Sequence, residues 1–198
     1  YFLKYIDKKK VNEVKEIVKK VNWSCDVYYK INEENKGAEI TITSAIDWVF
    51  ENEKCVIIIE DDILAPLSFF NFADEMLKRY KNNDKIWAIS GVNFLESRCM
   101  DDDDYFFSKY GNTWGWATWK STWEKFDLNT EIDNKHLENR FLENITNTKL
   151  EQKYYKNKFL RIKKNGIGNS TWDQIASYMH RVNNLLYVVP KKNLVSNI

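Results

Sequence analysis

The sequence predicts an α/β fold, a doubly wound and mostly parallel sheet with helices on its two faces. Three observations support this fold class. Apolar residues alternate between helical and strand spacing through the first half of the chain. Cys55 to Ile59 is a continuous apolar run, as in strands that are buried on both faces of a parallel sheet. The 198 residues are 43% hydrophobic and 30% charged, a balance typical of one globular domain with a substantial core.

The first half of the chain is expected to alternate four strands with three helices. Strands are expected at 1–6, 27–31, 55–59 and 86–90, where β-branched, aromatic and apolar residues gather. Helical spacing of apolar residues predicts helices over 11–21 and 42–50. A third helix should begin at Pro66, which suits a first turn, and its buried stripe should be Phe69, Ala73, Met76, Leu77 and Tyr80.

The second half is less regular. In chain order we expect a solvated loop at 101–104, a strand at 105–110, a helix at 117–126, helical sequence over 135–164, a breaker at 165–170, a helix capped by Thr171 and a strand at 185–189. The last helix should carry Trp172, Ile175, Met179 and Val182 on one face.

Charge and cysteine content exclude several classes of protein. Lys plus Arg number 30 and Asp plus Glu number 29, so a net charge of +1 gives no overall attraction to nucleic acid. Three widely spaced cysteines argue against a disulfide framework or structural zinc and favour the cytoplasm. No apolar run is long enough to cross a bilayer and no signal peptide is visible. We therefore expect a cytoplasmic chain without a transmembrane segment, with peripheral association at the inner face of the membrane as the alternative. Both ends read as internal to a longer protein.

Three acids, Glu60, Asp61 and Asp62, directly follow the most apolar strand. Ligands of open α/β sheets bind beyond the carboxyl ends of strands, and adjacent acids there repel one another unless a cation compensates them. Carboxylates suit Mg²⁺ or Mn²⁺, which can bridge to a diphosphate. Because side chains alternate along a strand, Glu60 and Asp62 should point one way and Asp61 the other. We assign Asp62 to the metal and Asp61 to ribose or sugar hydroxyls; a solvated loop that caps the next helix is the alternative.

An ordered set of segments surrounds these acids. They are Ser44 to Trp48, Glu60 to Phe70, Ile89 to Phe94, Trp114 to Trp119 and Pro190 to Ile198. Together they resemble glycosyltransferases related to N-acetylglucosaminyltransferase I, and more closely their bacterial relatives of the GT-A fold. The resemblance covers most of the chain. It implies one glycosyltransferase core over 1–198, with 1–95 as the nucleotide-sugar-binding half and 96–198 as the acceptor-side half.

The resemblance also implies an activity. A sugar would pass with inversion from a nucleotide diphosphate sugar, usually a uridine diphosphate sugar, to a hydroxyl of a glycan or glycolipid acceptor. Mn²⁺ or Mg²⁺ would be bound by Asp62, and Glu60, Asp61, Asn35 and Gly37 would contact the donor. Relatives usually begin with an earlier strand that holds the nucleotide base, and many take another metal ligand from beyond the last strand. We expect both parts to lie outside this chain.

Inverting transfer requires a general base that takes the proton from the attacking hydroxyl. Asp173 is the candidate, because it follows Trp172 in the first turn of a helix that a Gly-rich loop precedes. Relatives place an acid after Trp at a comparable point, and a neighbour one position away is an alternative. A helix-start Asp that stabilises the helix dipole is another. His180, two turns along the same helical face, is expected to be a core or surface residue.

Four of the eight tryptophans fall within residues 114–123. Trp116, Trp119 and Trp123 share helical spacing, which favours core packing for most of them. Indole faces also stack on sugar rings, and glycine lets the backbone approach a ligand closely. We therefore assign Trp114, Gly115 and Trp116 to the cleft between donor and acceptor.

Other functions fit parts of the pattern. A sugar-nucleotide or carbohydrate-binding module of the same fold would keep binding without turnover. A nucleotidyltransferase has a related architecture, but the sequence shows no Gly-rich phosphate loop with a basic residue near its start. If neither binding nor catalysis holds, a scaffold role is the remaining interpretation.

Overall fold

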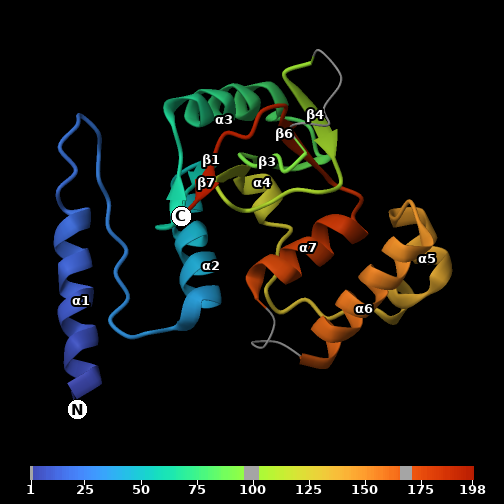
Figure 1. Cartoon of the computed structure of the whole chain (residues 1–198), viewed down its shortest axis with the longest axis horizontal. Coiled ribbons are helices and arrows are strands. Elements are labelled where there is room, and N and C mark those ends of the chain that lie inside the picture. Colours follow the sequence, from blue (N-terminus) through green and yellow to red (C-terminus); the bar gives the residue numbers. More distant parts are fainter. Residues whose placement is uncertain (1, 96–102, 166–170) are drawn as a thin grey trace. The chain divides into compact units, whose positions relative to one another are not determined.

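The computed structural model describes residues 2–95, 103–165 and 171–198 (Figure 1). The chain forms two compact units, Tyr1–Asn35 and Lys36–Ile198, which are described separately. Among the described residues, no helix has both the length and the apolar character needed to span a membrane.

The first unit contains the helix α1, Phe2–Val18. The strand expected at 1–6 is wrong for residues 2–6, which form the first turns of this helix, while Tyr1 lies outside the described residues. Lys9 and Glu13 pair along the helix at 3.9 Å, and such spacing supports a helix rather than a strand. The strand expected at 27–31 is also absent from the described residues. Strands are stable only where a neighbour completes their hydrogen bonds, and β propensity alone does not supply one.

The second unit carries the sheet and its helices. In chain order the elements are α2 (Gly37–Phe50), β1 (Cys55–Ile58), β2 (Ile63–Leu64), α3 (Leu67–Tyr80), β3 (Ile86–Ser90), β4 (Tyr105–Ser108), β5 (Trp116–Trp119), α4 (Lys120–Trp123), the 3-10 helix η2 (Asn134–Leu137), α5 (Asn139–Ile145), α6 (Lys149–Asn165), α7 (Trp172–Val182), β6 (Leu186–Pro190) and β7 (Ser196–Asn197). The helix expected from Pro66 is confirmed: Pro66 caps α3, and Phe69, Ala73, Met76 and Leu77 are buried.

Within the described residues, five strands form one sheet in the order β1-β5-β3-β6-β4, and β2 pairs with β7 separately. The α/β class is confirmed, whereas the sheet is mixed rather than mostly parallel. β3 and β6 are parallel, but β5 runs antiparallel to β1 and β3, and β4 runs antiparallel to β6. β1, expected at the buried centre, lies at the edge of this sheet and is only partly buried. Strands from 1–95 and from 96–198 share the sheet, so the two predicted halves are interleaved.

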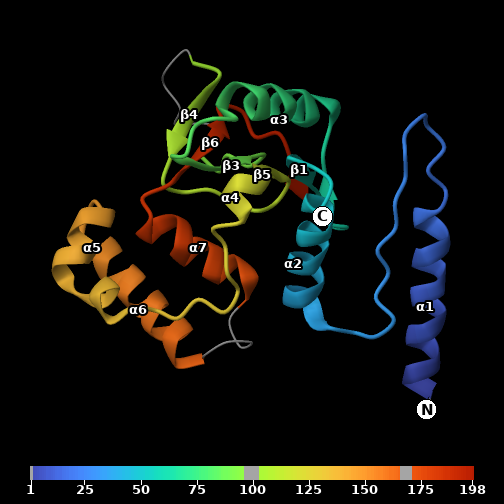
Figure 2. The same cartoon turned by 180° about the vertical axis from the view of Figure 1, so that it is seen from behind.

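Helices cover both faces of the sheet (Figures 1 and 2). α3 packs on one face with Phe69, Met76 and Leu77, against Ile89 and Val188 of the central strands. The other face carries α2, α4 and α7, whose apolar residues pack with ring side chains of the sheet, namely Trp87, Trp116 and Tyr187. A further apolar cluster joins α5 and α6 to the side of α7 that faces away from the sheet.

Two predictions in the second half are corrected. The helix expected at 117–126 is instead β5 followed by the short helix α4. Trp116 and Trp119 therefore sit on opposite faces of a strand rather than on one face of a helix, and both are buried. The helical stretch expected over 135–164 is broken into η2, α5 and α6. Residues 166–170 of the breaker and 101–102 of the acidic loop lie outside the described residues, while Asp103 and Asp104 are exposed.

Candidate functional site

The three acids form a turn at the carboxyl end of β1. The backbone N–H of Ile63 donates to the Glu60 carbonyl at 3.1 Å and closes the turn. The expected strand-like alternation of these side chains is therefore wrong, because residues 60–62 are not in a strand. Glu60 is half-buried, whereas Asp61 and Asp62 are exposed. The carboxylates of Asp61 and Asp62 are therefore open to solvent, whereas that of Glu60 is partly enclosed by protein.

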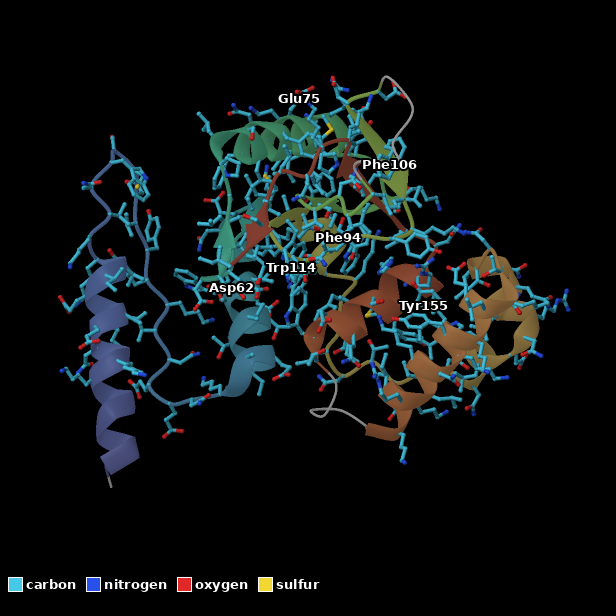
Figure 3. The ribbon with its side chains drawn as sticks, viewed as in Figure 1. Asp62, Glu75, Phe94, Phe106, Trp114 and Tyr155 are labelled. Atoms are coloured by element: carbon cyan, nitrogen blue, oxygen red, sulfur yellow. The ribbon has the colours of Figure 1, made fainter. Side chains whose placement is uncertain are left out.

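Asp62 is held by the end of the chain. Its carbonyl accepts the backbone N–H of Ile198 at 2.9 Å, and its side-chain Oδ2 accepts Nδ2 of Asn197 at 2.9 Å. These bonds accompany the pairing of β2 with β7, in which Ile63 lies opposite Asn197. Figure 3 labels Asp62 at this part of the molecule. The amide of Asn197 therefore orients one oxygen of the exposed Asp62 carboxylate.

Asn93 fixes the loop that leads to β7. Its side chain is buried and donates to the carbonyls of Pro190 at 3.0 Å and Lys191 at 2.7 Å. Its backbone N–H donates to Oδ1 of Asn193 at 3.0 Å. A buried amide with several partners holds its surroundings in one arrangement. Asn93 and Asn197 were not assigned as site residues from the sequence, although both lie in segments that carry the resemblance. Their place in those segments is the signal that could have pointed to them, whereas the contact of Asn197 with Asp62 is visible only in the structure.

Asp173 is positioned by stacked indole rings. Trp116 lies opposite Ile58 in the β1–β5 pairing, two residues before Glu60. The ring of Trp172 stacks on that of Trp116, with centroids 5.6 Å apart and planes at 23°. Asp173 follows Trp172 in the first turn of α7 and is exposed. The start of α7 is thereby brought toward the end of β1.

The charges of the turn and of α7 act on one carboxyl group. Burial raises the pKa of Glu60 above its ordinary value, and the negative charges of Asp62 and Asp61 raise it further. The negative charge of Asp173 is the smallest of the causes that raise this pKa. The mutual repulsion of Glu60, Asp61 and Asp62 favours binding of a cation.

The aromatic residues divide between surface and core. Trp114 is half-buried, and its ring meets the exposed ring of Phe94 edge to face, with centroids 5.8 Å apart (Figure 3). Phe94 was not singled out from the sequence. The structure places Trp116 in the core with 1% of its surface exposed, so its ring packs against protein rather than offering a surface. Gly115 has a φ of +57°, and a Cβ there would lie 2.9 Å from Cγ1 of Val195. The close approach at this glycine is to Val195.

Asn35 and Gly37 belong to different units of the chain. Asn35 is an exposed residue of the first unit, and Gly37 begins α2 in the second. Gly37 has a φ of +78°, a conformation that favours glycine, which accounts for this residue through the backbone alone. Their assignment to the donor stays a prediction.

The carboxylates of the acidic turn suit a metal ion that takes its remaining ligands from phosphate and water. Within residues 2–95, 103–165 and 171–198, no group of three or more His, Cys, Asp and Glu side chains is arranged to hold a metal ion. Mg²⁺ and Mn²⁺ in nucleotide sites are commonly held by one or two carboxylates, with phosphate oxygens and water in the other positions. The exposed and oriented carboxylate of Asp62 fits that pattern.

A scan against models of protein families and a search of curated proteins find no match to this sequence.

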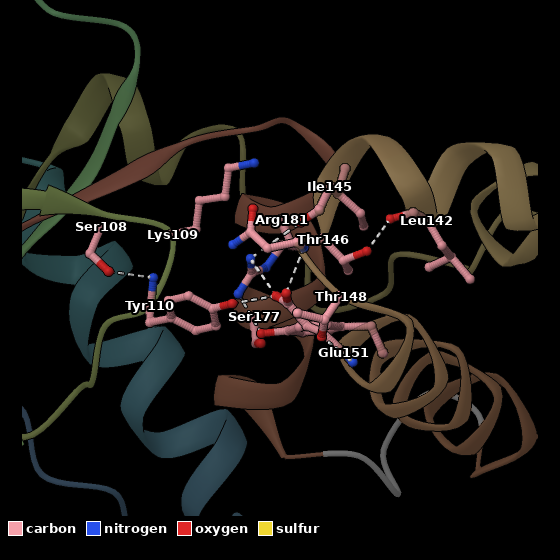
Figure 4. A network of polar contacts seen from close by, with 12 residues as sticks. Ser108, Lys109, Tyr110, Leu142, Ile145, Thr146, Thr148, Glu151, Ser177 and Arg181 are labelled. Carbon is pink, nitrogen blue, oxygen red and sulfur yellow. Dashed lines mark hydrogen bonds and ion pairs between the residues drawn. The ribbon is translucent and has the colours of Figure 1, made fainter.

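The other end of α7 is anchored by a buried cation (Figure 4). Arg181 is 2% exposed and pairs with Glu151 of α6 at 3.6 Å. Its guanidinium also donates to the hydroxyl of Tyr155 and lies over the ring of Tyr110, 4.6 Å from the ring centre. The Tyr110 hydroxyl donates in turn to Glu151. This network connects α7 to α6 and to the segment after β4.

His180, beside Arg181, is a core residue, as expected. Its ring nitrogens lie 3.1 Å from the carbonyl of Ala176 and 3.2 Å from that of Lys109. Burial lowers the pKa of His180 to about 4, so the ring is neutral near pH 7. Both ends of α7 are therefore fixed, which holds Asp173 at its start.

Proposed function

We propose that this chain is part of the catalytic core of a metal-dependent inverting glycosyltransferase of the GT-A fold. The observation that carries the proposal is the acidic turn at the carboxyl end of β1, where Asn197 orients the exposed carboxylate of Asp62. The mixed α/β sheet and the ring contact between the exposed Phe94 and the half-buried Trp114 support the same function. The donor would be a nucleotide diphosphate sugar, with a uridine diphosphate sugar preferred, and the acceptor a hydroxyl of a surface glycan or glycolipid.

Each side chain has one task in this proposal. Asp62, oriented by Asn197, holds Mn²⁺ or Mg²⁺, and Asp61 binds ribose or sugar hydroxyls. The metal, when bound, offsets the negative charge that develops on the leaving diphosphate. Asp173 accepts the proton of the acceptor hydroxyl as that oxygen attacks the anomeric carbon. Trp114 and Phe94 offer aromatic faces and edges to a sugar ring. The reaction would take place at the inner face of the membrane or in the cytoplasm.

The test is Mn²⁺-dependent release of free nucleotide from a panel of nucleotide sugars, with candidate acceptors present. A thermal-shift screen of the same donors, with and without Mn²⁺, first identifies the donor. Asp62→Asn should abolish both the metal-dependent shift and turnover. Asp173→Asn should lower the rate at least about a hundredfold while donor affinity stays nearly unchanged.

The matched control is Asp84→Asn, which removes the same charge from an exposed turn before β3. It should leave turnover and the thermal shift unchanged. Wild-type rates in both Asp62→Asn and Asp173→Asn would refute the assignment. Donor binding that persists in a chelator, without any turnover, would favour a binding module of the same fold.

A further inference from the structure

α6 concentrates positive charge in a chain that is otherwise slightly acidic. The helix contains seven Lys and Arg residues and one Glu, a net charge of +6 over 17 residues. The whole chain has a net charge of +1, so the residues outside α6 carry a net charge of −5. A basic helix on a neutral protein creates a local field that attracts an anionic surface.

The exposed surface of α6 also carries large apolar side chains. Leu150 is 79% exposed, Tyr154 58% and Leu160 44%. The opposite face of α6 is buried, because Tyr155, Phe159 and Ile162 pack in the apolar cluster with α7. Leu150 and Tyr154 are one turn apart and therefore neighbours on the helix surface. Large apolar side chains exposed next to basic ones are characteristic of helices that lie in the interface of a bilayer.

A hollow of about 250 Å³ adjoins this face. Its lining residues are Asn139, Leu142, Lys149, Gln152, Lys153 and Lys156. Lys149 pairs with Glu143 at 2.8 Å, and Lys156 donates to Asn139 at 3.2 Å, so two of the lysines are held at the rim. Phosphate carries charge and acceptor oxygens that match several ammonium groups at once. The hollow therefore suits a phosphate group that reaches α6 from outside.

We propose that the exposed face of α6 docks on an anionic phospholipid bilayer. Lys153, Arg161 and Lys164 approach the headgroups, while Leu150 and Tyr154 enter the boundary between headgroups and acyl chains. The hollow of Lys149, Lys153 and Lys156 receives a headgroup phosphate. Charge complementarity favours an anionic partner, and exposed leucines favour a lipid over nucleic acid, because leucine gains from hydrocarbon contact and does not stack on bases. The proposal does not depend on catalysis.

The test is flotation of the full chain with vesicles of phosphatidylcholine alone or of phosphatidylcholine mixed with phosphatidylglycerol. Wild type should bind the mixed vesicles, and binding should weaken as salt is raised. Lys153→Glu with Arg161→Glu should weaken partition about tenfold or more, because each basic residue near an anionic surface contributes roughly 1 kcal/mol. Leu150→Ser with Tyr154→Ser should weaken it severalfold without any change in charge.

The control is Lys81→Glu with Lys85→Glu, the same change of net charge at exposed positions outside α6. It should bind as wild type does, and thermal unfolding should confirm that every variant is folded. The proposal is overturned if wild type fails to bind the mixed vesicles, or if the control loses as much binding as the α6 charge variant. Equal binding by wild type and the Leu150/Tyr154 variant would also overturn it, because the face would then not enter the bilayer.

Discussion

The indole rings of Trp116 and Trp172 stack at 5.6 Å, and this contact joins the strand beside β1 to the helix that carries Asp173. Trp123 meets both rings, at 6.1 Å from Trp116 and 6.4 Å from Trp172. Asp47 of α2 accepts the indole N–H of Trp123 at 2.7 Å. Three tryptophans from separate elements therefore set the position of α7 relative to the sheet.

Removal of the Trp172 ring should be costly. Trp172→Ala leaves a cavity next to two indoles and should lower the free energy of unfolding by about 3 to 5 kcal/mol. Trp172→Phe keeps an aromatic ring and should cost clearly less. Urea denaturation of both variants measures the difference. Equal losses would mean that the ring stack does not position α7.

The raised pKa of Glu60 predicts a pH-dependent stability. A folded-state pKa above the unfolded value means that ionised Glu60 destabilises the folded protein, so stability falls as the pH rises through this range. Glu60→Gln should therefore stabilise the protein near pH 7 by a few tenths of a kcal/mol, since the group is partly solvated. The gain should vanish below about pH 4, where Glu60 is protonated. Thermal unfolding at both pH values, with Asp84→Asn as the control, measures this gain.

The glycine at position 115 should be irreplaceable for two separable reasons. Gly115→Ala would place an alanine at a φ of +57° and its Cβ 2.9 Å from Cγ1 of Val195. Gly37→Ala would also place an alanine at a positive φ, +78°, but the nearest atom to its Cβ, Oε2 of Glu39, is 3.6 Å away. We expect a loss of about 1 kcal/mol for Gly37→Ala and a larger loss for Gly115→Ala. Val195→Ala should recover part of the second loss only. A double-mutant cycle in urea measures this coupling, and strict additivity would contradict the contact.

The buried ion pair of Arg181 should be sensitive to loss of either partner. Arg181→Met leaves Glu151 without its cation and should lower the free energy of unfolding by about 3 to 5 kcal/mol. Burial alone would raise the pKa of Glu151, but the backbone N–H of Asn147, the Tyr110 hydroxyl and Arg181 together lower it. The stability from ionised Glu151 is therefore complete above the ordinary Glu pKa and is lost as the pH falls through the lowered value.

Glu151→Gln tests that pH dependence. It should destabilise the protein near pH 7 by about 1 to 3 kcal/mol, and the difference from wild type should shrink in acid. Urea denaturation near pH 7 and near pH 3 gives the comparison. A difference that is constant with pH would show that the charge of Glu151 has no part in the network.

The sequence by itself predicted those helices and strands that can be recognised from the apolar residues of a single segment. The stripe Phe69, Ala73, Met76 and Leu77 predicted α3, because one side of a surface helix must be apolar. The apolar run before Glu60 predicted β1 and placed the acids at its carboxyl end. These inferences need only the periodicity of a single segment.

Only the tertiary structure decided how segments meet. Trp116 and Trp119 show helical spacing, yet they belong to a strand buried on both faces, and single-segment periodicity does not separate these cases. The pairing of Asn197 with Asp62 joins residues 135 positions apart through two-residue strands, which leave almost no pattern in the sequence. The stack of Trp116 and Trp172 joins β5 to the start of α7, which carries Asp173. Such contacts depend on packing between segments that are distant in the sequence. The acidic residues could therefore be identified from the sequence, whereas the residues that contact them could not.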